Sequence, residues 1–393
     1  MTVAETALYA LPPEVDAIRR AVARLCADFP PTYWREHDAA RAYPTAFVDA
    51  LTKGGFLAAL IPTEYGGAGL PLVAAAAIMQ QIQESGGNGA ACHAQMYMMG
   101  AILRHGTPEQ RARYLPQIAS GALRFQAFGV TEPGSGTDTA AIRTRAVRTG
   151  SGWRIDGQKI WTSRAQHSDL MLLLARTSDP PPSGKRHDGL SLFVVDMREA
   201  VGHGLTIRPI RTMMNHATTE VFLDGVEVPE DALLGTEGQG FRCVLTGMNA
   251  ERILIGAECV GDARWFVAKA AAYARERVVF GRPIGQNQGV AFPLARCFAE
   301  TETARAIVYR AAEVYDTGAP CGAEANLAKL VASEAAWHAA DTCVQTHGGF
   351  GFAEEYDVER KFRETRLYRV APVSENLVLA YFAEHCLDLP RSF

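Results

Sequence analysis

The sequence predicts a mostly α-helical α+β multidomain protein, with an N-terminal helical domain, a central antiparallel β domain and a C-terminal four-helix bundle. Three observations support this fold class. Apolar residues recur at helical spacing up to about residue 124, alternate with polar residues from about 125, and return to helical spacing after about 236. The predicted domains are therefore residues 1–124, 125–236 and 237–393, and 393 residues suffice for two or three domains.

The N-terminal domain begins with an amphipathic segment. Val15, Ile18 and Val22 follow Pro13 at the spacing of one helix face. Further helices are predicted over about 71–84 and 90–105 and from Pro108 onward, with a glycine-rich loop at 66–69. This part of the chain is predicted to be entirely helical.

The central domain shows strand patterns. Residues 153–161 alternate between apolar and polar side chains, and short apolar runs follow at 170–175, 191–195 and 220–228. The segment 176–189 is rich in proline, glycine and charge, which predicts an exposed loop. The strands are expected to form an antiparallel sheet.

The C-terminal domain returns to helices. Long apolar-periodic segments cover about 239–277, 286–316, 323–346 and 372–387. Four long helices joined by short connections predict a bundle.

Composition excludes several classes of protein. The net charge of −4 gives no basic field for nucleic acid, and no apolar run approaches the length of a membrane span. The N-terminus lacks the pattern of a signal or transit peptide, so a cytoplasmic protein is expected. The eight cysteines show no zinc-ligand spacing, and neither a disulfide framework nor a metal site is expected.

The segment Ala127–Asp138, AFGVTEPGSGTD, is the strongest candidate for a binding loop. Its proline and glycines make a tight loop that another molecule can approach closely, and its threonines and serine add hydroxyls. Trp161 offers a flat apolar face at the end of the alternating segment. Together they predict a site for a planar, anionic cofactor.

Other nucleotide and catalytic signatures are absent from the sequence. The glycines at 134 and 136 lack the third glycine and the βαβ context of a Rossmann site. No P-loop, HExxH or GxSxG motif occurs. His347 is interpreted as a packed or solvent-facing residue at a helix end rather than as a base.

One carboxylate lies on an apolar helix face. Glu251 follows Met248 by three positions and precedes Ile255 by four, which places it on the same face of a helix. A buried carboxylate serves either as a general base or as part of a structural salt bridge, for example with Arg252. The spacing by itself favours the salt bridge slightly.

A second candidate is the helix end Arg275–Gly281. Arg277 can pair with a phosphate and Phe280 can stack on a ring. By composition alone, such a segment is more often a solvated helix terminus.

Five motifs occur in an order and at spacings that resemble the acyl-CoA dehydrogenase family along nearly the whole chain. They are VTEPGSGTD, WTS, VFLDGVEVPEDALLG, ERVVFGRPIGQNQ and QTHGGFGF. The resemblance implies the three-part fold predicted above, FAD as cofactor, and an oligomer in which two subunits share each cofactor. The family's usual state is a homotetramer.

The resemblance also implies roles for individual residues. Val130 and Thr131 would line the flavin, Thr137 the acyl-CoA entrance, and Trp161 and Ser163 the face and edge of the isoalloxazine. The remaining cofactor positions would serve a neighbouring subunit's FAD, its pyrophosphate or its adenine half: Arg277, Phe280, Gln288, Gln345, Gly348, Gly349, Ser374 and Asn376.

The chain departs from the family at the usual catalytic base. Many members carry a glutamate where this sequence has Pro372, which cannot accept a proton and fits the first turn of a helix. A branch that includes isovaleryl- and long-chain-type enzymes places the base on the earlier helix, at the position of Glu251. The resemblance therefore implies that Glu251 is the base, with Met248, Asn249 and Arg252 on the substrate side.

The implied reaction is the α,β-dehydrogenation of an acyl-CoA thioester to the trans-2-enoyl-CoA. Glu251 would take the α-proton, the β-hydrogen would pass as hydride to flavin N5, and an electron-transferring flavoprotein would accept the electrons. Three alternatives stay open: a flavin monooxygenase or oxidase, a non-oxidative acyl-CoA lyase, and a non-catalytic protein on the same fold. Side chains near Gln95, Met96 and Met99 could set the depth of an acyl pocket, although core packing explains the methionines equally well.

Overall fold

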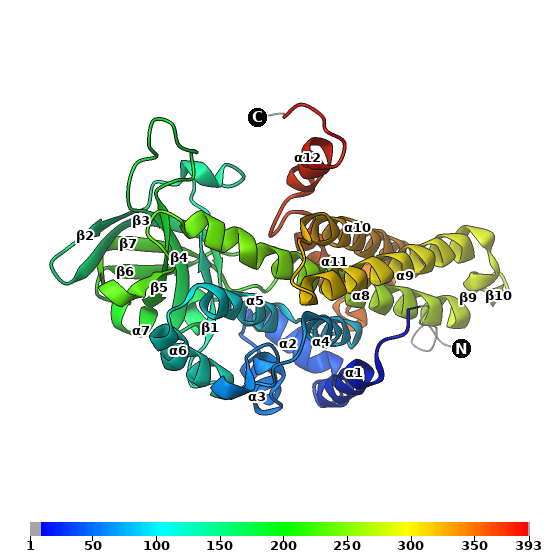
Figure 1. The fold of residues 1–393 in the computed structure, drawn as a ribbon. Coiled ribbons are helices and arrows are strands. Elements are labelled where there is room, and N and C mark those ends of the chain that lie inside the picture. The colour runs from blue at the N-terminus through cyan, green and yellow to red at the C-terminus, as the bar shows by residue number, and fades with distance from the viewer. Residues whose placement is uncertain (1–8, 392–393) are drawn as a thin grey trace. The chain divides into compact units, whose positions relative to one another are not determined.

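The computed structural model describes residues 9–391, so the first eight residues of the N-terminal segment discussed above lie outside the described residues. The chain divides into two compact units (Figure 1). The helical unit contains Met1–Ala40, Pro71–Gly89 and Asn249–Phe393, and the sheet unit contains Arg41–Leu70 and Ala90–Met248. Because this division follows contacts rather than chain order, the three-domain division by sequence stays a prediction.

The helical unit contains helices from both ends of the chain. They are α1 (Pro13–Cys26), α2 (Pro31–Ala40), α4 (Leu72–Glu84), most of α8 (Gly240–Glu276), α9 (Gln288–Asp316), α10 (Gly322–His347), α11 (Val358–Thr365) and α12 (Glu375–His385). A short hairpin of β9 (Val278–Val279) and β10 (Arg282–Pro283) joins α8 to α9 (Figure 1). The division between the units falls inside α8.

Helix α11 was not predicted from the sequence. Its charged residues Arg360, Lys361 and Glu364 are buried rather than solvated. The Lys361 ammonium lies 2.5 Å from the Asp262 carboxylate of α8 and donates to the Gln83 side chain at 2.8 Å. Ion pairs and hydrogen bonds therefore replace the apolar face on which a periodicity argument depends.

Helix α12 begins later than predicted. Ser374 is its N-cap, and the serine hydroxyl accepts a hydrogen bond from the backbone N–H of Leu377. Pro372 therefore lies before the helix, and the prediction that it occupies the first turn is wrong. The serine cap, which satisfies an amide of the first turn, sets the boundary.

Besides the first residues of α8, the sheet unit contains an eight-stranded sheet and the α-helices that surround it in the chain. The helices are α3 (Thr45–Lys53), α5 (Ala90–His105), α6 (Pro108–Ser120) and α7 (Met197–Ala200). The strands are β1 (Phe125–Gly129), β2 (Arg145–Arg148), β3 (Gly152–Ser163), β4 (Leu170–Arg176), β5 (Leu190–Asp196), β6 (Leu205–Pro209), β7 (Thr218–Pro229) and β8 (Leu233–Leu234).

The sheet runs in the order β6-β7-β3-β2-β4-β5-β8, with β1 also paired to β4. Most neighbours are antiparallel as predicted, but β1 and β2 both pair with β4 in parallel. β4 lies far along the chain from both strands. The alternation of residues within a strand does not show whether it pairs with such a partner in a parallel or an antiparallel way.

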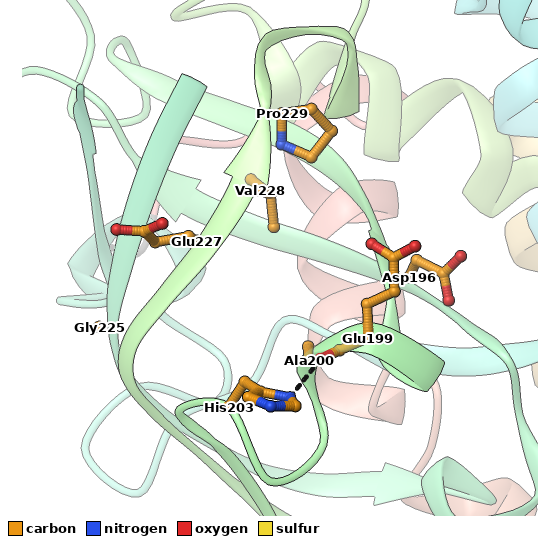
Figure 2. A pocket seen from close by; sticks show the side chains of 8 residues that line it. All are labelled: Asp196, Glu199, Ala200, His203, Gly225, Glu227, Val228 and Pro229. Atoms are coloured by element: carbon orange, nitrogen blue, oxygen red, sulfur yellow. Dashed lines mark hydrogen bonds between the residues drawn. The ribbon is translucent and has the colours of Figure 1, made fainter. Parts of the chain in front are cut away.

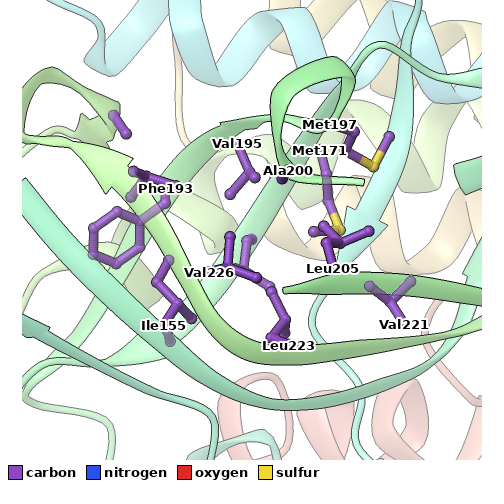
Figure 3. Packing of buried hydrophobic residues seen from close by; sticks show 14 of the residues in the cluster. Ile155, Met171, Phe193, Val195, Met197, Ala200, Leu205, Val221, Leu223 and Val226 are labelled. Atoms are coloured by element: carbon purple, nitrogen blue, oxygen red, sulfur yellow. The ribbon is translucent and has the colours of Figure 1, made fainter. Parts of the chain in front are cut away.

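One face of the sheet carries the core of this unit. Figure 3 shows Phe193 and Val195 of β5 in the same cluster as Leu223 and Val226 of β7, although the two strands are not neighbours in the sheet. The buried Trp153 ring meets Phe193 edge to face at a centroid distance of 5.3 Å. This core holds β3 and β7 rigidly, and β3 ends in the predicted binding residues. Within residues 9–391, no helix combines the length and apolar character that a membrane crossing needs.

Candidate active site

The predicted binding loop follows β1, and a buried ion pair on its inner side holds it in place. The Lys159 ammonium lies 2.9 Å from the Glu132 carboxylate and donates to the Val130 carbonyl oxygen at 3.0 Å. The same carboxylate accepts the backbone N–H groups of Arg143 at 2.7 Å and Thr144 at 2.8 Å. A loop that contains exposed glycines is thus held in one conformation by hydrogen bonds to its backbone.

The outer side of this loop is open. Thr137, Gly134 and Gly136 are exposed, and a Cβ atom built on either glycine would meet no atom within 4 Å. Val130 and Thr131 are partly buried at the base of the loop. The surface that the sequence predicts for cofactor and substrate is therefore accessible to a ligand.

Trp161 has a backbone conformation that is unusual for its residue type. Its φ is 62°, in the left-handed region, and the pairing of β3 with β7 shifts register between Lys159 and Thr162. The indole is nevertheless 57% exposed. A bulky residue kept in this conformation costs on the order of 1–3 kcal/mol, and such positions cluster at functional sites.

The structure brings the loop and the indole together. The Ile160 backbone N–H donates to the Thr131 carbonyl oxygen at 2.9 Å, so the base of the loop lies against the end of β3. Ser163, partly buried, ends that strand. The sheet unit therefore gathers Val130, Thr131, Trp161 and Ser163 in one place, as a wall that we call the ring-binding wall.

The helical unit gathers a second set of predicted residues at the far end of α8. Arg277, Phe280, Gln288, Gln345, Gly348 and Gly349 are all exposed. Phe280 is 100% exposed, at a φ of 53°. The Arg277 guanidinium lies 5.8 Å from the centre of the Phe350 ring, which joins the hairpin to the segment after α10. Phe350 was not predicted, although it stands inside the QTHGGFGF motif.

His347 is packed, in agreement with its interpretation from the sequence. Its ring stacks on Tyr273 at 4.3 Å and its Nδ1 lies 2.8 Å from the Cys343 carbonyl oxygen. Burial lowers the pKa of His347, so the neutral form is favoured.

Glu251 is buried on α8 with 4% of its surface exposed. The adjacent Arg252 donates to the Asn249 side-chain oxygen at 2.6 Å and to the Asn326 side-chain oxygen at 3.2 Å. Burial lowers the pKa of Arg252, and the Glu251 charge opposes that shift. Met248 is the residue before Asn249, so the four predicted residues follow one another closely on one helix. Asn326, which lies on α10, was not predicted, because no motif marks it.

The remaining predicted residues lie at the start of α12. Ser374 has a structural use as the N-cap, and Asn376 is exposed in the first turn. A contact of either residue with a cofactor stays a prediction.

A separate pocket lies in the sheet unit (Figure 2), with a cavity of about 250 Å³. It is lined by side chains that include Asp196, Glu199, Glu227 and His203, and the His203 ring hydrogen-bonds the Glu199 carbonyl oxygen at 3.0 Å. None of the predicted site residues lines it. Among residues 9–391, no group of three or more histidine, cysteine, aspartate or glutamate side chains is arranged to hold a metal ion.

Comparison with known proteins gives one consistent family. Residues 12–122, 127–226 and 238–376 match the models of the N-terminal, middle and C-terminal domains of acyl-CoA dehydrogenase. Acyl-CoA dehydrogenase FadE12 of Mycobacterium tuberculosis is 36% identical over 383 residues, which cover 97% of each chain. The mitochondrial short/branched chain specific acyl-CoA dehydrogenase of Rattus norvegicus is 31% identical over 341 residues, covering 86% of this chain and 77% of that protein.

Solved structures agree. Glutaryl-coenzyme A dehydrogenase in complex with glutaryl-CoA has a TM-score of 0.90 at 28% identity and covers 98% of both chains. Butyryl-CoA dehydrogenase from Megasphaera elsdenii has a TM-score of 0.89 at 26% identity, over 96% of this chain and 99% of that one. The matches extend along almost the whole chain in sequence and in structure, so the chain belongs to the acyl-CoA dehydrogenase family of flavin-dependent oxidoreductases.

Proposed function

We propose that this protein catalyses the FAD-dependent α,β-dehydrogenation of an acyl-CoA thioester to the trans-2-enoyl-CoA, with Glu251 as the base. One observation carries the assignment of the base. Glu251 is a buried carboxylate beside Arg252 on α8, whereas Pro372 stands where many family members carry a glutamate. A proline side chain has no group that accepts a proton, so the base comes from another element.

The residues of the ring-binding wall fit a flavin. An exposed indole, held on a left-handed backbone beside threonine and serine hydroxyls, suits a flat ring with polar edges. When bound, the flavin would accept the β-hydrogen of the substrate as hydride. Val130, Thr131, Trp161 and Ser163 would hold its ring, while Thr137 would line the acyl-CoA entrance.

The exposed residues of the helical unit fit the rest of FAD bound by a second copy of the chain. Arg277 supplies a positive charge for a diphosphate, Gly348 and Gly349 leave room for one, and Phe280 supplies an exposed ring. Gln288, Gln345, Ser374 and Asn376 would add polar contacts. The proposal therefore includes a homo-oligomer, a tetramer as is usual in the family, with an electron-transferring flavoprotein as electron acceptor.

Glu251 would take the α-proton of the thioester onto its carboxylate. Asn249 and Asn326 fix the Arg252 guanidinium but do not neutralise it, so its positive charge acts on the neighbouring carboxylate. Met248 would contribute an apolar contact to the acyl chain. Charge that develops on the thioester oxygen needs hydrogen-bond donors, and Pro372 has no backbone N–H to offer. We assign that role to another amide of the same segment.

The test is anaerobic mixing of FAD-loaded protein with a panel of acyl-CoA esters, scored by flavin bleaching. We expect Glu251→Gln to slow bleaching by about 10²–10⁴-fold with the best ester, because a general base typically contributes that factor. Glu258→Gln is the matched control. Glu258 is also a buried glutamate of α8, bonded to Gln83 and Tyr368, and its variant should bleach near the wild-type rate.

Bleaching of Glu251→Gln at the wild-type rate would remove Glu251 from the role of base. Two further outcomes would replace the proposal with another reaction on the same fold. Fast reoxidation of the reduced flavin by oxygen, with peroxide or a hydroxylated product, would identify an oxidase or monooxygenase. Conversion of an acyl-CoA without bleaching would identify a non-oxidative lyase.

A further inference from the structure

The ion pair beneath the ring-binding wall is buried on both sides. Lys159 is 0% exposed and Glu132 is 8% exposed. A buried ion pair of this kind gives little net stability, because the loss of hydration offsets most of the attraction, and apolar residues of similar volume often do as well. The groups that the pair contacts, rather than its net stability, therefore indicate what it does here.

The pair is bonded almost entirely to the backbone of one loop. Glu132 joins two distant parts of it: the carboxylate accepts the N–H groups of Arg143 and Thr144, and the Glu132 backbone exchanges hydrogen bonds with Ser135 at 3.1 and 3.0 Å. The Lys159 ammonium adds the Val130 carbonyl oxygen at 3.0 Å. The two side chains thus hold the beginning and the end of the loop at once, while backbone hydrogen bonds close its turn.

The same lysine connects the loop to the strand that carries the indole. Lys159 is paired with Val221 in the sheet, and the register shift that leads to Trp161 begins immediately after it. Its backbone is therefore part of the rigid sheet, while its ammonium reaches the peptide that links Val130 to Thr131. A change at Lys159 would let the loop move relative to Trp161.

We propose that Lys159 and Glu132 are positioning residues that set the affinity for the flavin and the environment of its ring, by fixing the loop of residues 130–144 against the end of β3. Neither side chain needs to touch the flavin. The inference rests on the proposed function, because that function makes this loop and Trp161 the two sides of the ring site.

The test compares Lys159→Met, Glu132→Gln and the double variant with the wild-type holoenzyme. FAD release on dilution is followed by the rise in flavin fluorescence, the bound flavin by its visible absorption spectrum, and folding by urea denaturation. We expect each single variant to release FAD at a concentration at least tenfold higher than the wild type, and its bound flavin to shift toward the spectrum of free flavin.

The double variant separates positioning from stability. It buries no unpaired charge, so its unfolding midpoint should return toward the wild-type value, while its weak FAD binding and altered spectrum should persist. A purely structural pair would recover both properties together, and that result would overturn the proposal. If the single variants do not fold, the comparison of FAD binding and unfolding midpoint in the double variant alone still tests the proposal.

Lys361→Met is the matched control. Lys361 is equally buried and paired with a carboxylate, but it lies in α11 of the helical unit. We expect a lower unfolding midpoint with FAD affinity within twofold of the wild type. Equal weakening of FAD binding in this control would also overturn the inference. If the wild-type protein binds no FAD, the proposed function itself is rejected. This outcome is distinct from a failure of the inference, which shows only when the variants are compared with a wild type that binds FAD.

Discussion

Burial affects the pKa values of the two charged residues beneath the ring-binding wall, Lys159 and Glu132. Burial lowers the pKa of Lys159 to about 8, because the enclosed ammonium loses more hydration energy than its carboxylate partner returns. Burial acts to raise the pKa of Glu132, but the Lys159 charge and the bonds from residues 143 and 144 outweigh it and leave that pKa below its usual value. The lysine is the more deeply enclosed partner, so it bears the larger penalty.

This difference predicts a pH dependence of stability. Between about pH 8 and 10.5, the unfolded chain keeps the Lys159 proton that the folded protein has lost. The unfolded state then binds more protons, so the contribution of this group to the free energy of unfolding rises with pH, by about 1.4 kcal/mol per pH unit. Below about pH 8 both states are protonated and this contribution is constant.

Urea denaturation of the wild type and of the Lys159→Met, Glu132→Gln double variant between pH 7 and 10 measures the effect. The difference in free energy of unfolding between them should grow in favour of the wild type above pH 8. Parallel curves over that range would show that Lys159 does not titrate there.

At the scale of elements, helix ends and loops decide where the functional groups stand. α8 carries Met248, Asn249, Glu251 and Arg252 on neighbouring turns, and a short hairpin presents Phe280 beyond its end. α12, in contrast, depends on a single residue at its N-terminus. It is a short helix with Leu379 exposed on its surface, so its start depends on the Ser374 cap.

Removal of that cap has a local consequence. Ser374→Ala should cost about 1 kcal/mol of helix stability, because a first-turn amide loses its acceptor. Hydrogen exchange at Leu377 and Val378 should be faster in this variant, while Ser374→Asp, which can still cap, should exchange as the wild type does. Unchanged exchange in Ser374→Ala would show that the cap does not hold α12. Weaker FAD binding in both variants would support the cofactor contact predicted for Ser374.

At the scale of the whole molecule, the helical unit leaves large apolar side chains uncovered. Phe280, Phe292, Phe352 and Val278 are 100%, 62%, 76% and 56% exposed. Where such side chains lie together, they are typical of a surface that another protein covers. The proposed partner is a second copy of the chain, which would bring its FAD to the same residues.

Replacement of Phe280 tests this assembly. Phe280→Ser should shift the protein toward smaller species in analytical ultracentrifugation and weaken FAD retention, because the exposed ring would serve both the subunit contact and the cofactor. Val201→Ser removes an apolar residue that is 49% exposed in the sheet unit and should change neither property. A Phe280→Ser protein that keeps its mass and its FAD would contradict the proposed partner surface.

The sequence alone determined the order of helical, sheet and helical regions, because apolar periodicity is a local property of the chain. It also identified the loop at 127–138, the apolar face of Trp161 and the carboxylate of Glu251 as candidates, because each departs from the pattern around it. The family resemblance rested on the same local motifs.

Only the tertiary structure decided which distant groups meet. It paired Lys159 with Glu132, Lys361 with Asp262, and Arg252 with Asn326, and it placed β1 and β2 in parallel beside β4. In the sequence the charged residues of α11 have the pattern of a solvated surface, which is why this helix was missed. A buried charge is tolerated only where a partner from another element satisfies it, and that partner is known only once the chain has folded.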